Sequence, residues 1–136
     1  MAEIAKRLLV VSQYFWPEEF RINELAQALS EKGYEVVVLT GLPNYPSGFI
    51  FKEYTTDKSK FSDYHNVSVV RVPIITRRKG NLSLLLNYVS FVLSAVVIGS
   101  WRLRNKKFDG IFVFQTDPIT VAIPAIFLKY HYHTIF

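Results

Sequence analysis

The sequence contains no cysteine, and this absence excludes several classes of protein. Without a thiol, the 136-residue chain can form no disulfide, no thiolate zinc site and no cysteine nucleophile. Glycine and proline number only six each, which excludes collagen-like and low-complexity architectures. Half of the residues are hydrophobic, so the chain can bury enough apolar surface to offset the entropy cost of ordering. We therefore expect a single folded domain over residues 1–136.

Acidic residues are missing from a long central stretch of the chain. No Asp or Glu lies between Asp63 and Asp109, although this stretch holds eight of the sixteen Lys and Arg residues. The rest of the chain has eight basic and eleven acidic residues. The net charge of +5 is therefore a concentrated basic region on an otherwise mildly acidic domain.

Several common functional motifs are also absent. The first glycine of the chain is Gly33, so no Gly-x-Gly-x-x-Gly loop for NAD or FAD follows the first apolar run. The chain has neither a P-loop nor a Gly-x-Ser-x-Gly nucleophile motif. His131 and His133 have the spacing of two ligands on one strand, but no third ligand lies nearby, and the same segment equally suggests the start of a fifth strand. We predict no metal site and no cofactor.

Four short apolar runs alternate with segments that are expected to form helices or loops, as in an α/β protein. From Phe20 onward apolar residues recur at helical spacing, and Gly33 is typical of the position just after a helix end. A shorter helix is expected after Pro118 through Lys129, with Pro124 in an early turn or at a kink. These patterns predict an α/β, Rossmann-like sheet that is open, mainly parallel and covered by helices on both faces. The runs expected as buried strands are Leu8–Val11, Val36–Leu39, Val67–Val72 and Gly110–Phe114.

The segment Leu82–Trp101 is a run of twenty residues without a charge. Its length suits a transmembrane helix, but an α/β fold needs a crossover helix at this place in the chain. Three interpretations stay open: a spanning helix, an ordinary buried crossover helix, and a helix whose outer face enters the membrane interface. A narrow polar stripe on this helix is formed by Ser83, Asn87, Ser90 and Ser94.

Basic residues flank both ends of this apolar run. Each basic residue close to an anionic bilayer contributes about 1 kcal/mol of binding, so both ends can meet lipid headgroups. The alternative is that these residues are solvated helix ends, which the helix dipole favours at the carboxyl-terminal side. No nucleic acid is expected, because the basic residues bracket an apolar surface and include no recognition motif. The residues predicted to dock on the membrane are Arg77, Arg78, Lys79, Trp101, Arg102 and Arg104.

Four segments carry a family resemblance: Ser12–Glu18, Phe20–Ala26, Gly33–Gly48 and Gln115–Ala125. They resemble the amino-terminal domain of family 4 glycosyltransferases, most closely the branch that builds bacterial capsule, O-antigen or colanic-acid repeats on a lipid carrier. The resemblance implies the acceptor-side half of a GT-B fold, in an enzyme that transfers a sugar from a nucleotide-sugar donor to a lipid-linked acceptor with retention. It also implies metal-free chemistry and a peripheral, cytoplasmic location on the inner face of the bacterial plasma membrane.

The sequence departs from this family in two respects. Many members have paired glycines in the first loop, where the backbone approaches the donor phosphate, whereas this chain has Glu19-Phe20-Arg21. The donor-binding domain and its Glu-x7-Glu motif are absent from the chain. We therefore expect a truncated domain that is inactive by itself, with the nucleotide sugar held mainly by the missing domain.

Loops at the carboxyl ends of parallel strands hold the ligands of α/β proteins, so the candidate site residues are drawn from them. No catalytic residue is assigned. The aromatic residues Tyr14, Phe15 and Trp16 are expected in the core, with a stacking platform for a sugar or lipid as the alternative. A non-catalytic membrane-surface or partner-binding module remains the alternative function. The residues expected to contact substrate are Pro17, Glu18, Arg21, Asn23, Asn44, Tyr45, Gln115, Thr116 and Asp117.

Overall fold

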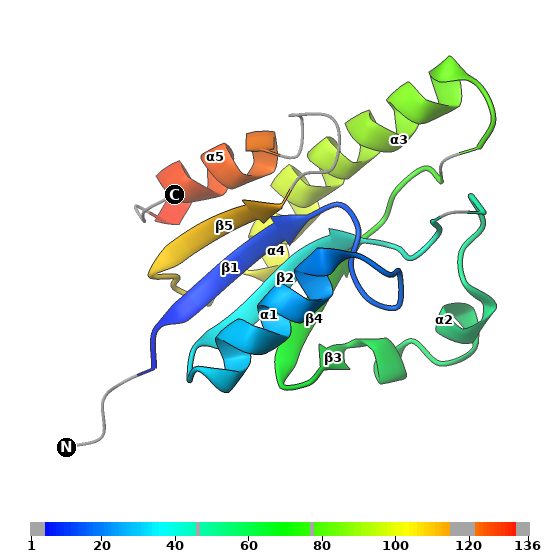
Figure 1. Cartoon of the computed structure of the whole chain (residues 1–136). Coiled ribbons are helices and arrows are strands. Elements are labelled where there is room, and N and C mark those ends of the chain that lie inside the picture. The colour runs from blue at the N-terminus through cyan, green and yellow to red at the C-terminus, as the bar shows by residue number, and fades with distance from the viewer. Residues whose placement is uncertain (1–4, 46, 77, 115–121, 133–136) are drawn as a thin grey trace.

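Five strands form one sheet in the order β3-β4-β2-β1-β5 in the computed structural model, which describes residues 5–45, 47–76, 78–114 and 122–132 (Figure 1). Strands β1, β2, β4 and β5 pair in parallel, and the two-residue β3 pairs with β4 in the antiparallel sense. The predicted mainly parallel, Rossmann-like sheet is confirmed, while the short β3 was not foreseen. The strands are β1 (Arg7–Ser12), β2 (Glu35–Gly41), β3 (Asp63–Tyr64), β4 (Val67–Val72) and β5 (Gly110–Phe114).

Strand β1 lies inside the sheet because both of its faces are apolar. Leu8 is aligned with Val36 of β2 on one side and with Gly110 of β5 on the other. Leu9, Val10 and Val11 are fully buried, as expected for a parallel strand covered on both faces. The loops that leave β1 and its neighbours therefore emerge at one edge of the sheet.

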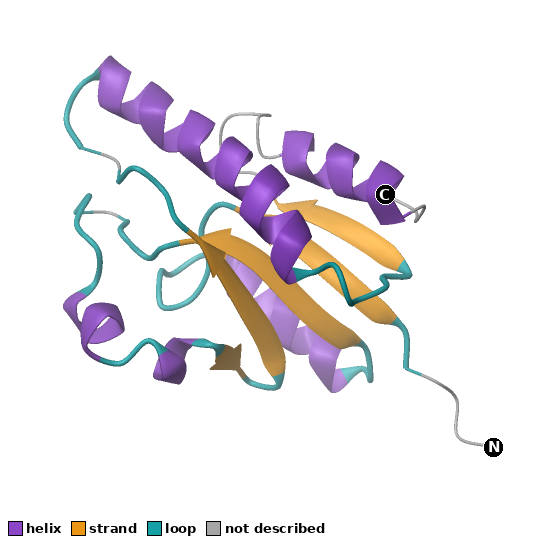
Figure 2. Cartoon of the chain, turned by 180° about the vertical axis from the view of Figure 1, so that it is seen from behind, coloured by secondary structure: helices purple, strands orange, loops and turns teal. Residues whose placement is uncertain are grey.

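Helices cover both faces of the sheet, as predicted (Figure 2). Helix α1 packs on one face through Ile22 and Ala26, against Val10 and Val38. The crossover between β4 and β5 covers the other face together with α5. The helical segments are α1 (Arg21–Glu31), α2 (Lys52–Thr56), η1 (Ser59–Phe61), α3 (Asn81–Ser94), the π-helical η2 (Ala95–Gly99), α4 (Ser100–Arg102) and α5 (Ala122–Tyr132).

Helix α1 ends where the sequence predicted. Gly33 adopts a φ of 94°, a left-handed conformation that favours glycine. The amide of Gly33 donates to the carbonyl of Ser30 at 3.0 Å, and the amide of Tyr34 donates to the carbonyl of Leu29 at 3.2 Å. These bonds satisfy carbonyl groups of the last helical turn and direct the chain into β2.

Helix α5 differs in part from the sequence expectation. Pro124 is its third residue and so lies in the first turn, where the missing amide hydrogen costs nothing. The helix continues through Tyr132, so the interpretation of His131 and Tyr132 as the start of a strand is wrong. His133 and residues 134–136 lie outside the described residues.

The charge-free run forms one apolar helical stretch, Asn81–Arg102, made of α3, η2 and α4. By length and composition this stretch could cross a membrane. Phe91, Ala95 and Gly99 are buried against the sheet, so the stretch is the crossover between β4 and β5 that the fold requires. A β carbon at Gly99 would lie 2.9 Å from Cδ2 of the buried Leu39, so a larger residue here would require Leu39 or the helix to shift.

We expect Gly99→Val to lower the free energy of unfolding by about 1–3 kcal/mol, because the added methyl groups would overpack the contact with Leu39. Val97→Ala is the matched control, since Val97 lies two residues away with its side chain exposed, and should change the stability by about 0.5 kcal/mol or less. Urea unfolding followed by circular dichroism measures both. Equal stability of the two variants would show that η2 does not pack closely on Leu39.

Candidate functional site

The first loop, between β1 and α1, contains a glutamate whose side chain is almost completely buried. Glu18 is 2% exposed. Its Oε2 accepts hydrogen bonds from the backbone amides of Asn44 at 3.1 Å and Tyr45 at 2.7 Å, and its Oε1 accepts one from the amide of Phe15 at 3.4 Å. One carboxyl group thus ties the loop after β1 to the loop after β2, and brings three of the predicted site residues together.

An arginine from β4 lies near this carboxyl group. Arg71 is 6% exposed and donates hydrogen bonds to the carbonyl of Gly41, at 3.2 Å, and to the carbonyl of Trp16. Its guanidinium lies 5.5 Å from the centre of the Tyr54 ring. In the sequence, Arg71 is one of the eight basic residues between Asp63 and Asp109 and was not predicted as a site residue. A single charge inside an otherwise apolar strand was the signal that could have identified it as a buried, internally paired residue.

Burial has the largest effect on the pKa of both Glu18 and Arg71. It raises the pKa of Glu18 from 4.5 to about 7, although the three amide hydrogen bonds and the charge of Arg71 act in the opposite direction. Burial also lowers the pKa of Arg71 to about 10. Because the carboxyl oxygens of Glu18 are already bonded, the residue positions the two loops, and a direct contact with substrate would require these bonds to break.

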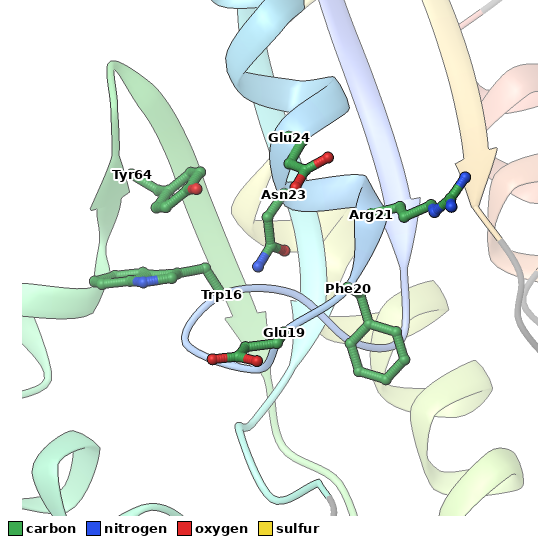
Figure 3. A pocket seen from close by; sticks show the side chains of 7 residues that line it. All are labelled: Trp16, Glu19, Phe20, Arg21, Asn23, Glu24 and Tyr64. Carbon is green, nitrogen blue, oxygen red and sulfur yellow. The ribbon is translucent and has the colours of Figure 1, made fainter.

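A cavity of about 410 Å³ opens beside the first turn of α1 (Figure 3). Figure 3 shows Trp16 and Tyr64 on one side of Asn23, with Phe20 and Arg21 on the other. The rings of Trp16 and Tyr64 are 5.2 Å apart, so they form an aromatic wall. Tyr64, which lies on the unforeseen β3, was not among the predicted site residues. The lining residues are Trp16, Glu19, Phe20, Arg21, Asn23, Glu24 and Tyr64.

Asn23 supplies an amide group to this cavity. Its side chain is 7% exposed, and Nδ2 donates to the carbonyl of Glu18 at 2.7 Å. Its Oδ1 is buried and has no hydrogen-bond partner among the described residues. A buried amide oxygen of this kind can accept a hydrogen bond from a hydroxyl donor that enters the cavity.

Three aromatic rings join the two loops next to Glu18. Tyr14 stacks on Phe20 with ring centres 5.1 Å apart, and Tyr45 lies 5.4 Å from Tyr14 and 5.2 Å from Phe20. Tyr14 and Phe15 are buried, as the core interpretation predicted, whereas Trp16 is half-buried and lines the cavity.

Two further predicted site residues lie in the loops after β1 and β2. Pro17 is half-buried in the first loop, and Asn44, whose amide donates to Glu18, is fully buried in the second. The residues Gln115, Thr116 and Asp117 lie outside the described part of the chain. No cluster of three or more His, Asp or Glu side chains that could hold a metal ion occurs among the described residues.

The polar stripe of α3 faces the protein interior. Asn87 is fully buried, with Oδ1 accepting from Nε2 of Gln13 at 2.6 Å and Nδ2 donating to the carbonyl of Ile75 at 2.8 Å. The Oγ atoms of Ser90 and Ser83 accept hydrogen bonds from backbone amides of the segment that precedes the helix. The stripe therefore satisfies the backbone of this segment and binds the first loop.

The side of the α3 stretch opposite the buried Phe91 and Ala95 carries exposed apolar residues. The interpretation of this stretch as an ordinary buried crossover helix is wrong for its outer face, because the side chains there are exposed. They are Leu82, Leu85, Leu86, Val89, Leu93 and Val97.

The residues predicted to dock on a membrane lie at the two ends of this face, except Arg77, which is outside the described residues. Arg78 and Lys79 are exposed before α3, and Trp101 is 63% exposed at the other end. The guanidinium of Arg104 lies 4.6 Å from the centre of the Trp101 ring. Arg102 donates to the backbone carbonyl of Arg71, which ties the end of the helix to β4.

Comparison with known proteins supports the fold. The chain matches no protein-family profile and no curated protein. A solved structure that it resembles is the C-terminal domain of a hydrogenase from Pyrococcus furiosus, with a TM-score of 0.58 and 16% sequence identity. The match covers 99% of this chain and 90% of that one. At this identity the likeness shows a shared α/β fold and carries no information about activity.

The buried Glu18 should make stability depend on pH. The folded chain keeps the proton up to about pH 7, whereas the unfolded chain releases it near pH 4.5, so the free energy of unfolding falls between these values and then stays level. Over this pH range, we expect the free energy of unfolding of Glu18→Gln to fall by about 2–3 kcal/mol less than that of the wild type. Urea unfolding from pH 4.5 to 8 measures it, and Glu19→Gln, at an exposed neighbour, should keep the wild-type profile. Parallel profiles for the wild type and Glu18→Gln would contradict the assignment.

Proposed function

We propose that the chain is the acceptor-side domain of a retaining glycosyltransferase, which moves a sugar from a nucleotide-sugar donor to a lipid-linked acceptor in the synthesis of cell-surface polysaccharide. The carboxyl group of Glu18 carries this proposal, because it joins the loops after β1 and β2, which belong to segments that resemble family 4 glycosyltransferases. Both loops lie at the carboxyl edge of a parallel sheet, where α/β proteins bind ligands.

The cavity beside α1 has the chemical character of a sugar site. The rings of Trp16 and Tyr64 offer flat apolar surfaces, and Asn23 offers an amide oxygen that has no hydrogen-bond partner in the described part of the chain. The carboxylates of Glu19 and Glu24 can accept hydrogen bonds from hydroxyl groups, while the guanidinium of Arg21 suits a phosphate. A diphosphate-linked sugar combines these features.

The outer face of α3 supports the membrane part of the proposal. A contiguous exposed apolar stripe marks an interaction surface, and this one is bordered by Arg78 and Lys79 at one end and by Arg102 and Arg104 at the other. A basic border around an apolar face fits the anionic inner leaflet of the bacterial plasma membrane. We therefore place the chain at the cytoplasmic surface of that membrane, with no role for nucleic acid.

The chain alone is proposed to be inactive. Most contacts with the nucleotide-sugar donor belong to a second domain outside this sequence, and the reaction as proposed uses no metal or cofactor. The alternative function, a non-catalytic membrane-surface module, is favoured by a separate observation, since the exposed stripe of α3 does not depend on any residue of the cavity. A measurement of sugar transfer distinguishes the two functions, because only the glycosyltransferase would transfer a sugar. Membrane binding does not distinguish them, because both functions require it.

The full-length protein that contains this chain should transfer a sugar from a UDP-, GDP- or dTDP-sugar to a polyprenyl-diphosphate sugar with retained anomeric configuration. Arg21→Ala should lower kcat/KM about tenfold, as the loss of one charge-assisted hydrogen bond implies. Lys32→Ala, just after the far end of α1, is the control and should leave kcat/KM unchanged. Thin-layer chromatography and NMR of the product measure transfer and configuration, and absence of transfer from every donor would refute the enzymatic function.

Binding to anionic vesicles should depend on the basic residues before α3. Reversing Arg78 and Lys79 to Glu removes two favourable charges, worth about 2 kcal/mol together, so binding should weaken at least about 30-fold. Lys58→Glu with Lys60→Glu makes the same charge change at η1 and should weaken binding much less. Cosedimentation with phosphatidylglycerol vesicles at low and high salt measures this. Binding that is insensitive to both salt and Arg78/Lys79 reversal would exclude electrostatic docking.

A further inference from the structure

Helix α5 carries a second outward apolar stripe that the proposed function does not use. Its sequence is apolar on nearly all sides, and the structure divides it into two faces. Ala125 and Leu128 are fully buried in the core that includes Phe91 of α3. The opposite face exposes four large side chains at positions i, i+3, i+4 and i+7, the spacing of one helix face. They are Ile123, Ile126, Phe127 and Tyr130, which are 49%, 45%, 43% and 72% exposed.

Helix α5 lies beside the carboxyl-terminal part of the α3 stretch, where it contacts α3 and η2. Helices α3 and α5 cover the same face of the sheet and lie side by side in both views (Figures 1 and 2). Leu82, Leu85, Leu86 and Val89 of α3 repeat the same i, i+3, i+4, i+7 spacing. Helices of a soluble domain normally turn such stripes toward the core, so stripes on the outside of two neighbouring helices form one extended interaction surface.

The charges around this surface indicate its partner. The sequence has no acidic residue in 81–108 or in 122–132, whereas Arg102 ends the α3 stretch and Arg104, Lys106 and Lys107 follow it. Trp101 and Tyr130 lie near the carboxyl-terminal ends of their helices and are more than half exposed. Tryptophan and tyrosine favour the boundary between lipid and water, and a basic border favours anionic headgroups.

We propose that the outer face of α5 is a second membrane-docking element, which inserts beside α3 into the interface of an anionic bilayer. The inference rests on the proposed docking of α3 and extends it. A single helix on a bilayer leaves the domain free to roll about the helix axis, whereas two neighbouring helices fix its orientation. The sheet then lies along the membrane with α1 on the far side.

The absence of cysteine permits a direct test by single-site labelling. Three variants, Tyr130→Cys on α5, Leu85→Cys on α3 and Leu25→Cys on α1, place one environment-sensitive fluorophore on each helix. Leu25 is the matched control because it is an exposed leucine on the opposite face of the sheet. Vesicles of phosphatidylcholine with phosphatidylglycerol are then added to each labelled chain, and circular dichroism checks that each variant is folded.

We expect stronger, blue-shifted emission at positions 130 and 85 and no change at position 25. A response at 85 but not at 130 would overturn the role of α5 and leave the docking of α3 intact. No response at either position would overturn both. A blue shift at 130 that grows with protein concentration in the absence of vesicles would also overturn the inference, because a second copy of the chain would then cover α5.

An unlabelled variant gives an independent measurement. Ile126→Asn with Phe127→Asn removes apolar area without adding charge, so binding to the anionic vesicles should weaken about tenfold or more while its salt dependence stays the same. Leu25→Asn should bind like the wild type. Unchanged binding of the α5 variant would contradict the proposal.

Discussion

The buried carboxyl group of Glu18 is the constraint on which the candidate site depends. It accepts backbone hydrogen bonds from Phe15, Asn44 and Tyr45, so the loop after β1 and the loop after β2 hold each other in place. Arg71 adds a second link, because its guanidinium donates to the carbonyl of Trp16 in the first loop and to that of Gly41, the last residue of β2. These partners stabilise the buried groups, because burying a polar group without hydrogen bonds is unfavourable.

The crossover helix shows a reversed distribution of polar and apolar side chains. Asn87 lies at the centre of the interior polar stripe and connects Gln13 of the first loop with Ile75 of the segment before the helix. Polar side chains are needed there because the irregular segment before α3 has backbone groups that no strand satisfies. The exposed leucines and valines lie on the outer face of the helix, where contact with an apolar medium would be favourable. The same polar contacts connect the proposed membrane surface to the proposed acceptor site.

The fold alone does not specify a function. A domain from a hydrogenase has a similar chain path, and parallel α/β sheets of this kind support many activities. The distinguishing features lie in the loops at the carboxyl edge and in the outer faces of α3 and α5. One sheet face with an apolar surface and a basic border, and one sheet edge with an aromatic and polar cavity, together fit an enzyme domain that works on a lipid-linked substrate at a membrane.

The sequence by itself determined the four parallel strands, the helix that ends before Gly33 and the crossover between β4 and β5, because each depends on local periodicity and turn chemistry. It also identified Glu18, Asn44 and Tyr45 as neighbours of one sheet edge. Only the tertiary structure decided that Arg71 is internal and that Tyr64 faces Trp16, since these contacts join distant segments. It also decided which faces of α3 and α5 are exposed. Both helices are apolar on several sides, so the choice depends on what each one packs against.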